Sequence, residues 1–176
     1  AYLLAGTISH IAFPKIANQP SDGGKAEVLG RYMRLTVVVT LVAAAGLFVL
    51  APWLVELLFG EAFLPSVPVV RVLVLGALPI ACKFILRGGF LAYDQGLLLS
   101  KASLFGLVIS AIALIFLLPA YGIIGAAWAV VIAQWLSFAL MAILARRNLG
   151  MSLLQLFRPR AADWRLAAAS LKVWRT

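Results

Sequence analysis

The sequence predicts an all-α integral membrane protein, and three observations carry that prediction. Of its 176 residues, 64% are hydrophobic and only 12% are charged, whereas a soluble domain averages about 25% charged residues. Two segments without any charged residue, 35–55 and 102–145, are 21 and 44 residues long. Since about 20 helical residues cross a bilayer core, the longer segment suffices for two crossings. Neither run alternates apolar with polar residues, which disfavours strands.

About five transmembrane helices are expected, the first of them truncated. Residues 1–13 have the pattern of a membrane helix already under way, with no initiator Met and no basic region. We therefore expect the chain to be the C-terminal part of a longer protein rather than to start with a signal peptide. The polar loop 14–25 contains two prolines and interrupts this helix. The second helix is expected to cross at about 35–59, followed by a short turn at 60–66.

Three further spans complete the predicted bundle. The third helix is expected over 67–93 and ends at the Asp-Gln-Gly turn 94–96. The fourth runs over about 98–118, where the segment PAYG (119–122) breaks the long apolar run. The fifth runs over about 123–145 and is stopped by two arginines.

The fourth and fifth helices carry small residues at every fourth position. These residues are Ala102, Gly106 and Ser110 on one helix and Gly125, Ala129, Ala133 and Ser137 on the other. Small residues at this spacing let two helix backbones approach closely within lipid. We expect these helices to pack on each other or on helices outside this chain.

The tail 148–176 is too basic and its last part too short for another span. Written as a helix, residues 161–176 place two tryptophans with Ala and Leu on one side and Arg165 and Lys172 on the other. This pattern favours an amphipathic helix lying on the lipid surface. The alternative is a frayed basic end.

The distribution of cations predicts the orientation. Of 15 Lys and Arg, 12 fall in the loop before the second helix, at Lys101, or in the tail, and none falls in the turns on the opposite side. The positive-inside rule therefore places that loop, the 94–96 turn and the C-terminus in the cytoplasm. The net charge of +9 is then a consequence of topology, and we expect no nucleic-acid partner.

The third helix contains the remaining cations: Arg71, Lys83 and Arg87. A central cation costs about 2.5–3.5 kcal/mol on the insertion scale. Arg71 lies near the outer end, and Arg87 is close enough to the inner end to snorkel. Lys83 is roughly 15 Å of helix from Tyr93, at about 1.5 Å per residue, and so lies near mid-membrane.

A shared face suggests why these cations are there. Gly76, Pro79, Lys83 and Arg87 recur at helical spacing, and Pro79 removes a backbone hydrogen bond and favours a bend. Such a face suits a wet cavity, and cations without an acidic partner suit a phosphate or diphosphate. The candidate substrate-binding residues are Lys83, Arg87 and Arg71. The alternative is that the cations snorkel or pair with an acid outside this chain. No catalytic set and no metal ligands are expected.

Several segments resemble a known transporter family. LLFGEAF (57–63), FLAYDQG (90–96) and LLPAYGIIGAAWAVVIAQ (117–134), with FPKIA (13–17) before them, resemble the C-terminal part of a polysaccharide-biosynthesis flippase of the O-antigen type. Its superfamily also includes multidrug exporters and the peptidoglycan-precursor flippase. The resemblance covers residues 1–147 and implies the last five of about twelve helices, arranged as part of one half of a two-bundle transporter.

The resemblance implies a function without catalysis or cofactors. The expected substrate is an undecaprenyl-diphosphate-linked oligosaccharide, moved by alternating access across the bacterial inner membrane for surface lipopolysaccharide or exopolysaccharide assembly. Its expected partners are this lipid-linked oligosaccharide, membrane lipids, and a polysaccharide polymerase or glycosyltransferase.

Two alternatives remain at this stage. A membrane glycosyltransferase or ligase acting on lipid-linked sugar would carry acidic residues in a large outer loop, but the outer loops here are short. A multidrug exporter of the same superfamily would favour acids in its cavity, and the predicted helices hold few.

Overall fold

The computed structural model describes residues 22–148, and in this part of the chain the secondary structure is helical. The elements are α2 (Asp22–Phe59), a 3-10 helix η1 (Glu61–Ser66), α3 (Val67–Leu75), α4 (Ala77–Ala92) and α5 (Gly96–Asn148). The truncated first helix lies outside the described residues, as do residues 149–176 of the basic tail with its predicted surface helix. The separation of a transmembrane part, 1–147, from a tail, 148–176, stays a prediction. The all-α prediction is confirmed for the described part.

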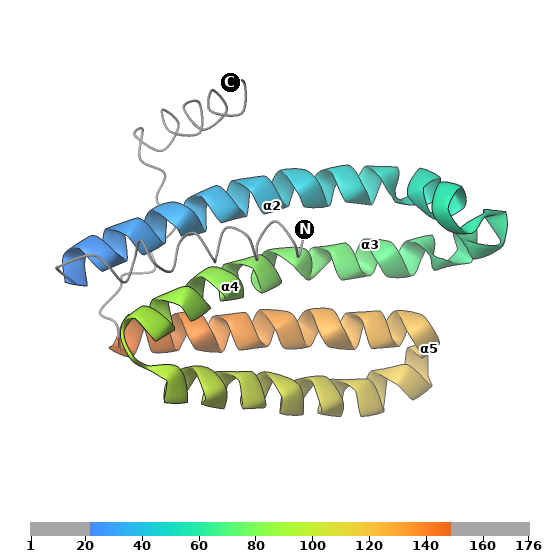
Figure 1. The fold of residues 1–176 in the computed structure, drawn as a ribbon. Coiled ribbons are helices and arrows are strands. Elements are labelled where there is room, and N and C mark those ends of the chain that lie inside the picture. Colours follow the sequence, from blue (N-terminus) through green and yellow to red (C-terminus); the bar gives the residue numbers. More distant parts are fainter. Residues whose placement is uncertain (1–21, 149–176) are drawn as a thin grey trace, which may run out of the picture.

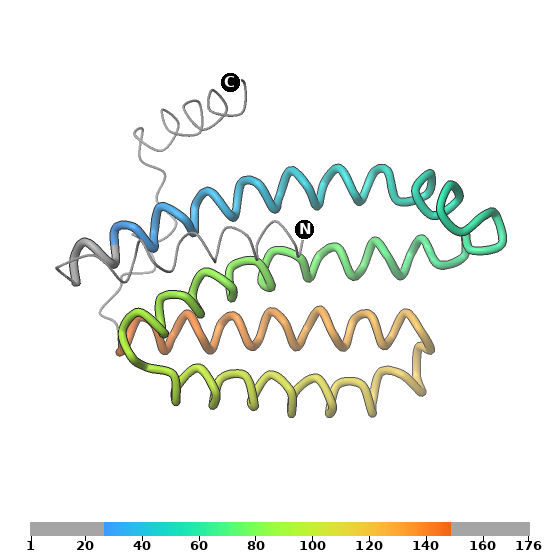
Figure 2. Tube along the Cα trace, in the orientation of Figure 1, coloured from blue at the N-terminus to red at the C-terminus, as the bar shows by residue number. Residues whose placement is uncertain are grey.

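Three stretches are long and apolar enough to cross a membrane: Glu27–Phe59, Glu61–Ala92 and Gly96–Asn148. The third is folded back on itself at Gly122, so it provides two antiparallel arms, 96–121 and 123–148. Figure 1 shows the second arm, in orange, between α4 and the first arm. Figure 2 traces the same path from α2 through α3 and α4 to the two arms.

The reversal within α5 depends on one glycine. Gly122 has φ 60° and ψ −142°, a conformation that side-chain-bearing residues adopt only with strain. The expected break at 119–122 is therefore confirmed in place but wrong in detail, because the helix continues through Pro119. Proline is tolerated there because neighbouring groups and local adjustments in membrane helices satisfy the freed carbonyl.

The predicted third span is two helices rather than one. α3 ends and α4 begins at Gly76, three residues before Pro79, and Figure 1 shows the two helices at an angle. The missing N–H of Pro79 leaves the carbonyl of Leu75 without its helical partner, so the helix divides where that bond would have been. The predicted bend is confirmed.

The turn between α4 and α5 is a well-formed helix end. Asp94 adopts the left-handed conformation with φ 55°. The N–H of Gln95 donates to the carbonyl of Phe90 at 2.8 Å, and that of Asp94 to Leu91 at 3.2 Å. This is the Schellman arrangement, with aspartate where glycine is usual. It directs α5 back along α4.

The main core lies among α2, α4 and α5. Leu29 and Met33 of α2, Ile85 and Phe90 of α4, and Met141 of α5 are almost completely buried there. A smaller cluster of Ala51, Val55 and Val67 joins α2 to α3. By contrast, much of the outer surface is apolar and exposed; in α2, for example, Leu57 is 82% exposed. A soluble protein would not expose so much apolar surface, whereas a bilayer would cover it.

Candidate functional site

Lys83 reaches from α4 to the second arm of α5. Its ammonium group donates a hydrogen bond to Oε1 of Gln134, and the Lys83 side chain is half-buried. The two faces of α4 differ in polarity. Cys82, Ile85 and Leu86 lie in the core, whereas Lys83 lies on the face toward Gln134 of α5. The break at Gly76 sets the direction of α4 and so places this cationic face against α5.

A cavity of about 420 Å³ lies where α4 meets the two arms of α5. This volume is within the usual range for small-molecule and cofactor sites. Its polar and charged lining residues come from all three segments and are Lys83, Arg87, Ser103, Ser110, Gln134 and Ser137. Its apolar and small lining residues are Ile80, Phe84, Leu99, Ala102, Gly106, Leu107, Ala133 and Met141.

Arg87 shares this cavity with Lys83. The two residues are four positions apart on α4, one helical turn, and both line the cavity. Lys83 is half-buried and Arg87 is exposed, so Arg87 lies nearer the mouth. None of the lining residues is acidic. The structure therefore brings together two of the three predicted site residues.

Arg71 is not part of this cavity. It lies on α3 and donates from Nε to the backbone carbonyl of Phe48 on α2, at 3.3 Å. Its guanidinium also lies 5.2 Å from the centre of the Phe48 ring, within the range of a cation–π interaction. The carbonyl of Phe48 would normally accept from the residue four positions later, which is Pro52 and has no N–H. Arg71 thus supplies the donor that Pro52 lacks.

The two arms of α5 meet closely beside the cavity. A Cβ placed on Gly106 would collide with Oγ of Ser137 in its present position and would lie 3.2 Å from Cβ of Ser137, so glycine favours this close contact. Ala102, Ala129, Ala133 and Ser137 are buried. The prediction that the small residues of the two spans pack together is confirmed at this contact.

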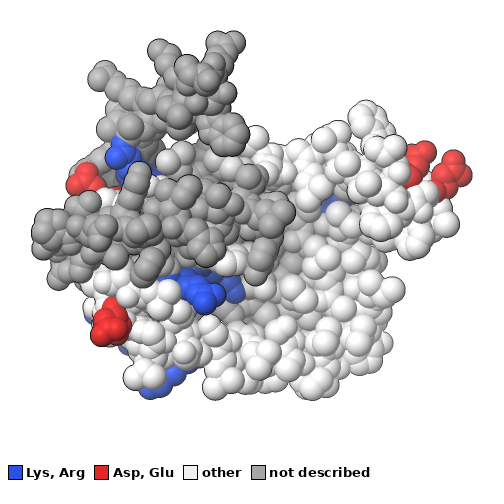
Figure 3. All heavy atoms as spheres, in the orientation of Figure 1, with Lys and Arg blue, Asp and Glu red and all other residues white. Residues whose placement is uncertain are grey.

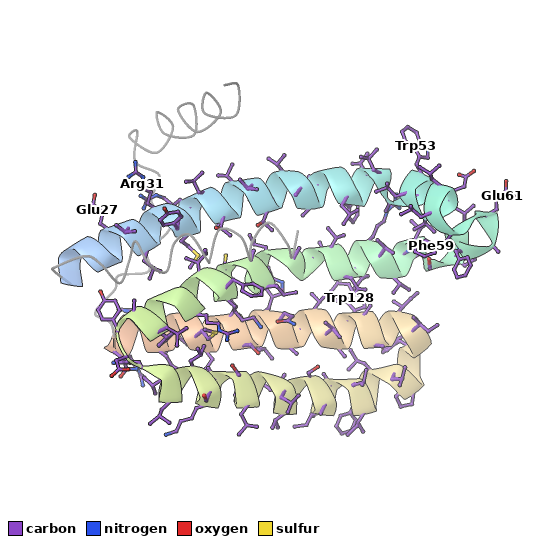
Figure 4. All side chains as sticks on the ribbon, in the orientation of Figure 1. Glu27, Arg31, Trp53, Phe59, Glu61 and Trp128 are labelled. Atoms are coloured by element: carbon purple, nitrogen blue, oxygen red, sulfur yellow. The ribbon has the colours of Figure 1, made fainter. Side chains whose placement is uncertain are left out.

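Cations gather at one end of the described bundle, whereas acids occur at both ends (Figure 3 and Figure 4). In the described chain, five cations lie at one end of the bundle. They are Arg31 and Arg34 near the start of α2, Lys101 near the start of α5, and Arg146 and Arg147 in the last turn of α5. Figure 3 shows acids and almost no cations at the other end. Figure 4 places Trp53, Phe59 and Glu61 there, opposite Glu27 and Arg31. This separation is the pattern on which the positive-inside prediction rests, and which side faces the cytoplasm stays a prediction.

Sequence reasoning missed Gln134 and the three cavity serines as site residues. One signal was present: Gln134 is the sole amide side chain in the uncharged run 102–145. An amide in the middle of a membrane span needs partners for its donors and acceptor. Among residues 22–148, no group of His, Cys, Asp and Glu could hold a metal ion. The lining groups can bind an anion and donate hydrogen bonds to hydroxyls or phosphate oxygens.

Comparison with known proteins assigns the family. A family model described as "Lipid II flippase MurJ" matches residues 2–174. No curated protein and no solved structure matches the chain. The resemblance to a lipid-linked flippase of this superfamily is thereby confirmed at the level of the superfamily, whereas the O-antigen type is not. The chain belongs to the lipid II flippase MurJ family, membrane transporters of lipid-linked precursors.

Proposed function

We propose that the protein moves a polyprenyl-diphosphate-linked saccharide across the bacterial inner membrane and that the α4–α5 cavity holds the diphosphate. The family match favours a lipid II type of precursor over the surface oligosaccharide suggested by the sequence resemblance. We propose transport without chemical change of the substrate, with the C-terminus in the cytoplasm as the cation distribution favours.

The observation that carries this proposal is the pairing of Lys83 and Arg87 in one cavity without an acid among its lining residues. Two uncompensated cations are costly inside a membrane, so such residues usually serve a ligand or an ion pathway. A diphosphate would supply the missing negative charge. An ammonium acts as a compact point charge, and a guanidinium can bind two oxygens at once.

The surroundings of the cavity suit a lipid-linked ligand. Leu107 lines the cavity and is 67% exposed, and Leu104 and Ile115 on the same arm are also exposed. An isoprenoid chain can therefore remain in the bilayer along this arm while its headgroup occupies the cavity. Ser103, Ser110 and Ser137 offer hydroxyl groups to phosphate or sugar oxygens.

The same charges disfavour a drug exporter as the second candidate. A cationic drug would meet Lys83 and Arg87 without a carboxylate among the lining residues, and like charges at short range repel.

The test replaces Lys83 by leucine in the full-length protein and places it in cells whose own lipid II flippase can be depleted. We expect Lys83→Leu to reach normal membrane levels, because removing a central cation eases insertion by about 2.5–3.5 kcal/mol. We expect it to lose at least 90% of lipid II translocation. Lys101→Leu is the control, since Lys101 is exposed on α5 outside the cavity.

Three results would contradict the proposal. Normal levels with normal translocation would show that Lys83 is dispensable. Loss of the protein itself would show that Lys83 forms a buried structural pair, because an unpaired partner would be left behind. Restoration of surface polysaccharide by the wild-type protein, without restoration of lipid II translocation, would assign a different substrate.

A further inference from the structure

Gln134 is the residue that holds Lys83 within the cavity. Lys83 has only donors, so the amide of Gln134 must turn Oε1 toward the ammonium group, as it does here. The NH₂ group of the same amide then points away from Lys83. We propose that Gln134 is a positioning and specificity residue that orients Lys83 for an anionic phosphate or diphosphate without neutralising it. This inference rests on the proposed function.

The acceptor that Gln134 offers to Lys83 is neutral. A carboxylate at this position would also hold Lys83, but its charge would cancel that of the ammonium and repel an incoming phosphate. An amide holds the ammonium in place and leaves its charge available. Since no acid is among the described residues that line the cavity, Lys83 and Arg87 give this lining a positive charge that an anionic ligand would offset.

The packing around Gln134 supports a fixed geometry. Its neighbours on the second arm of α5 are Ala133, which is buried, and Ser137, one turn further along. Ser137 lies so close to Gly106 that a Cβ at position 106 would require the Ser137 hydroxyl to turn away. The arm that carries Gln134 is thereby held against the first arm. From this arm the amide of Gln134 bridges to Lys83 on α4.

The NH₂ group of Gln134 adds a second part to the site. An amide directs its two N–H donors away from its oxygen. As Gln134 lines the cavity, these donors can meet phosphate oxygens beside Lys83. A charged donor and a neutral donor would then share one anionic group, a combination that favours phosphate over a neutral hydroxyl.

The experiment compares Gln134→Glu with Gln134→Met in the full-length protein. Glutamate keeps the acceptor and adds a charge; methionine keeps approximate size and removes the acceptor. Three quantities are measured: lipid II translocation, thermal stability in detergent, and affinity for farnesyl diphosphate with farnesol as the uncharged probe. We expect Gln134→Glu to lose at least tenfold in farnesyl diphosphate affinity and translocation, with a melting temperature equal to or above that of wild type.

Gln134→Met should have the opposite profile, with a lower melting temperature and only a several-fold loss of affinity. A purely structural role for Gln134 predicts that affinity follows stability, so that methionine is worse than glutamate. That order, or unchanged affinity in Gln134→Glu, would overturn the inference alone. A wild-type protein that binds farnesyl diphosphate no better than farnesol would overturn the proposed diphosphate site as well.

Discussion

The α2–α3 contact around Arg71 and the α4–α5 cavity around Lys83 use the same kind of residue in opposite ways. Arg71 donates to a backbone carbonyl and lies over the Phe48 ring, so its interactions serve the protein. Lys83 has one neutral acceptor and, with Arg87, lines a cavity of about 420 Å³. The partners of both cations are neutral, so charge compensation does not separate them. The difference is that Lys83 also lines a cavity that a ligand can enter, whereas Arg71 does not.

The largest expected effect is a difference in cysteine labelling. The end of the α2–α3 region near Glu61 and the end of the α4–α5 region near Lys101 should face opposite sides of the membrane. A cysteine at Glu61, beyond the α2–α3 contact, should react with an impermeant thiol reagent in intact cells. A cysteine at Lys101 should react only after the membrane is opened. Cys82 is buried, so the background should be low. The reverse labelling pattern would contradict the predicted orientation.

The next difference is between transport and stability. Arg87→Gln should reduce lipid II translocation several-fold with a normal protein level, because Arg87 is exposed at the cavity and makes a smaller packing contribution. Arg71→Met should do the reverse, with lower thermal stability and normal translocation per molecule of protein. Loss of translocation in stable Arg71→Met protein would restore Arg71 to the substrate-binding residues.

The smallest expected effect concerns the link between Arg71 and Pro52. Arg71→Met should destabilise the protein by about 0.6–2 kcal/mol, the range of hydrogen bonds between membrane helices. In a Pro52→Ala background, the new backbone N–H can pair with the carbonyl of Phe48, so the same replacement should cost less. A double-mutant cycle by thermal or detergent denaturation measures the coupling. Strict additivity would show that Arg71 does not fill the position left by Pro52.

Within the described residues, the sequence located the apolar spans because a long uncharged run can pair all its backbone groups internally as a helix. It also located the bend near Pro79 and the reversal at 119–122. It did not predict that the third span divides into α3 and α4 at Gly76. It could not show that Gly122 alone makes the reversal, since Pro119 and Gly122 are both helix breakers by type. The left-handed φ of Gly122 becomes apparent only once the two arms are seen to pack.

The candidate site was predicted only in part, and the reason is physical. Lys83 and Arg87 were found because charge in an apolar run is costly and visible in one sequence. Gln134 is neutral and lies 51 residues from Lys83, so their contact depends on how α5 folds back. Arg71 was grouped with them by charge alone. Its acceptor is a backbone carbonyl, which residue identity does not reveal unless the proline four residues after Phe48 is considered.

The central claim is that Lys83 binds a diphosphate, and a binding measurement tests it most directly. The full-length wild-type protein and its Lys83→Leu variant are compared in detergent for affinity toward farnesyl diphosphate and farnesol. We expect Lys83→Leu to weaken farnesyl diphosphate binding at least tenfold, equivalent to about 1.4 kcal/mol, and to leave farnesol binding unchanged. Equal affinity of the two proteins for farnesyl diphosphate, or an equal loss for both probes, would contradict the account.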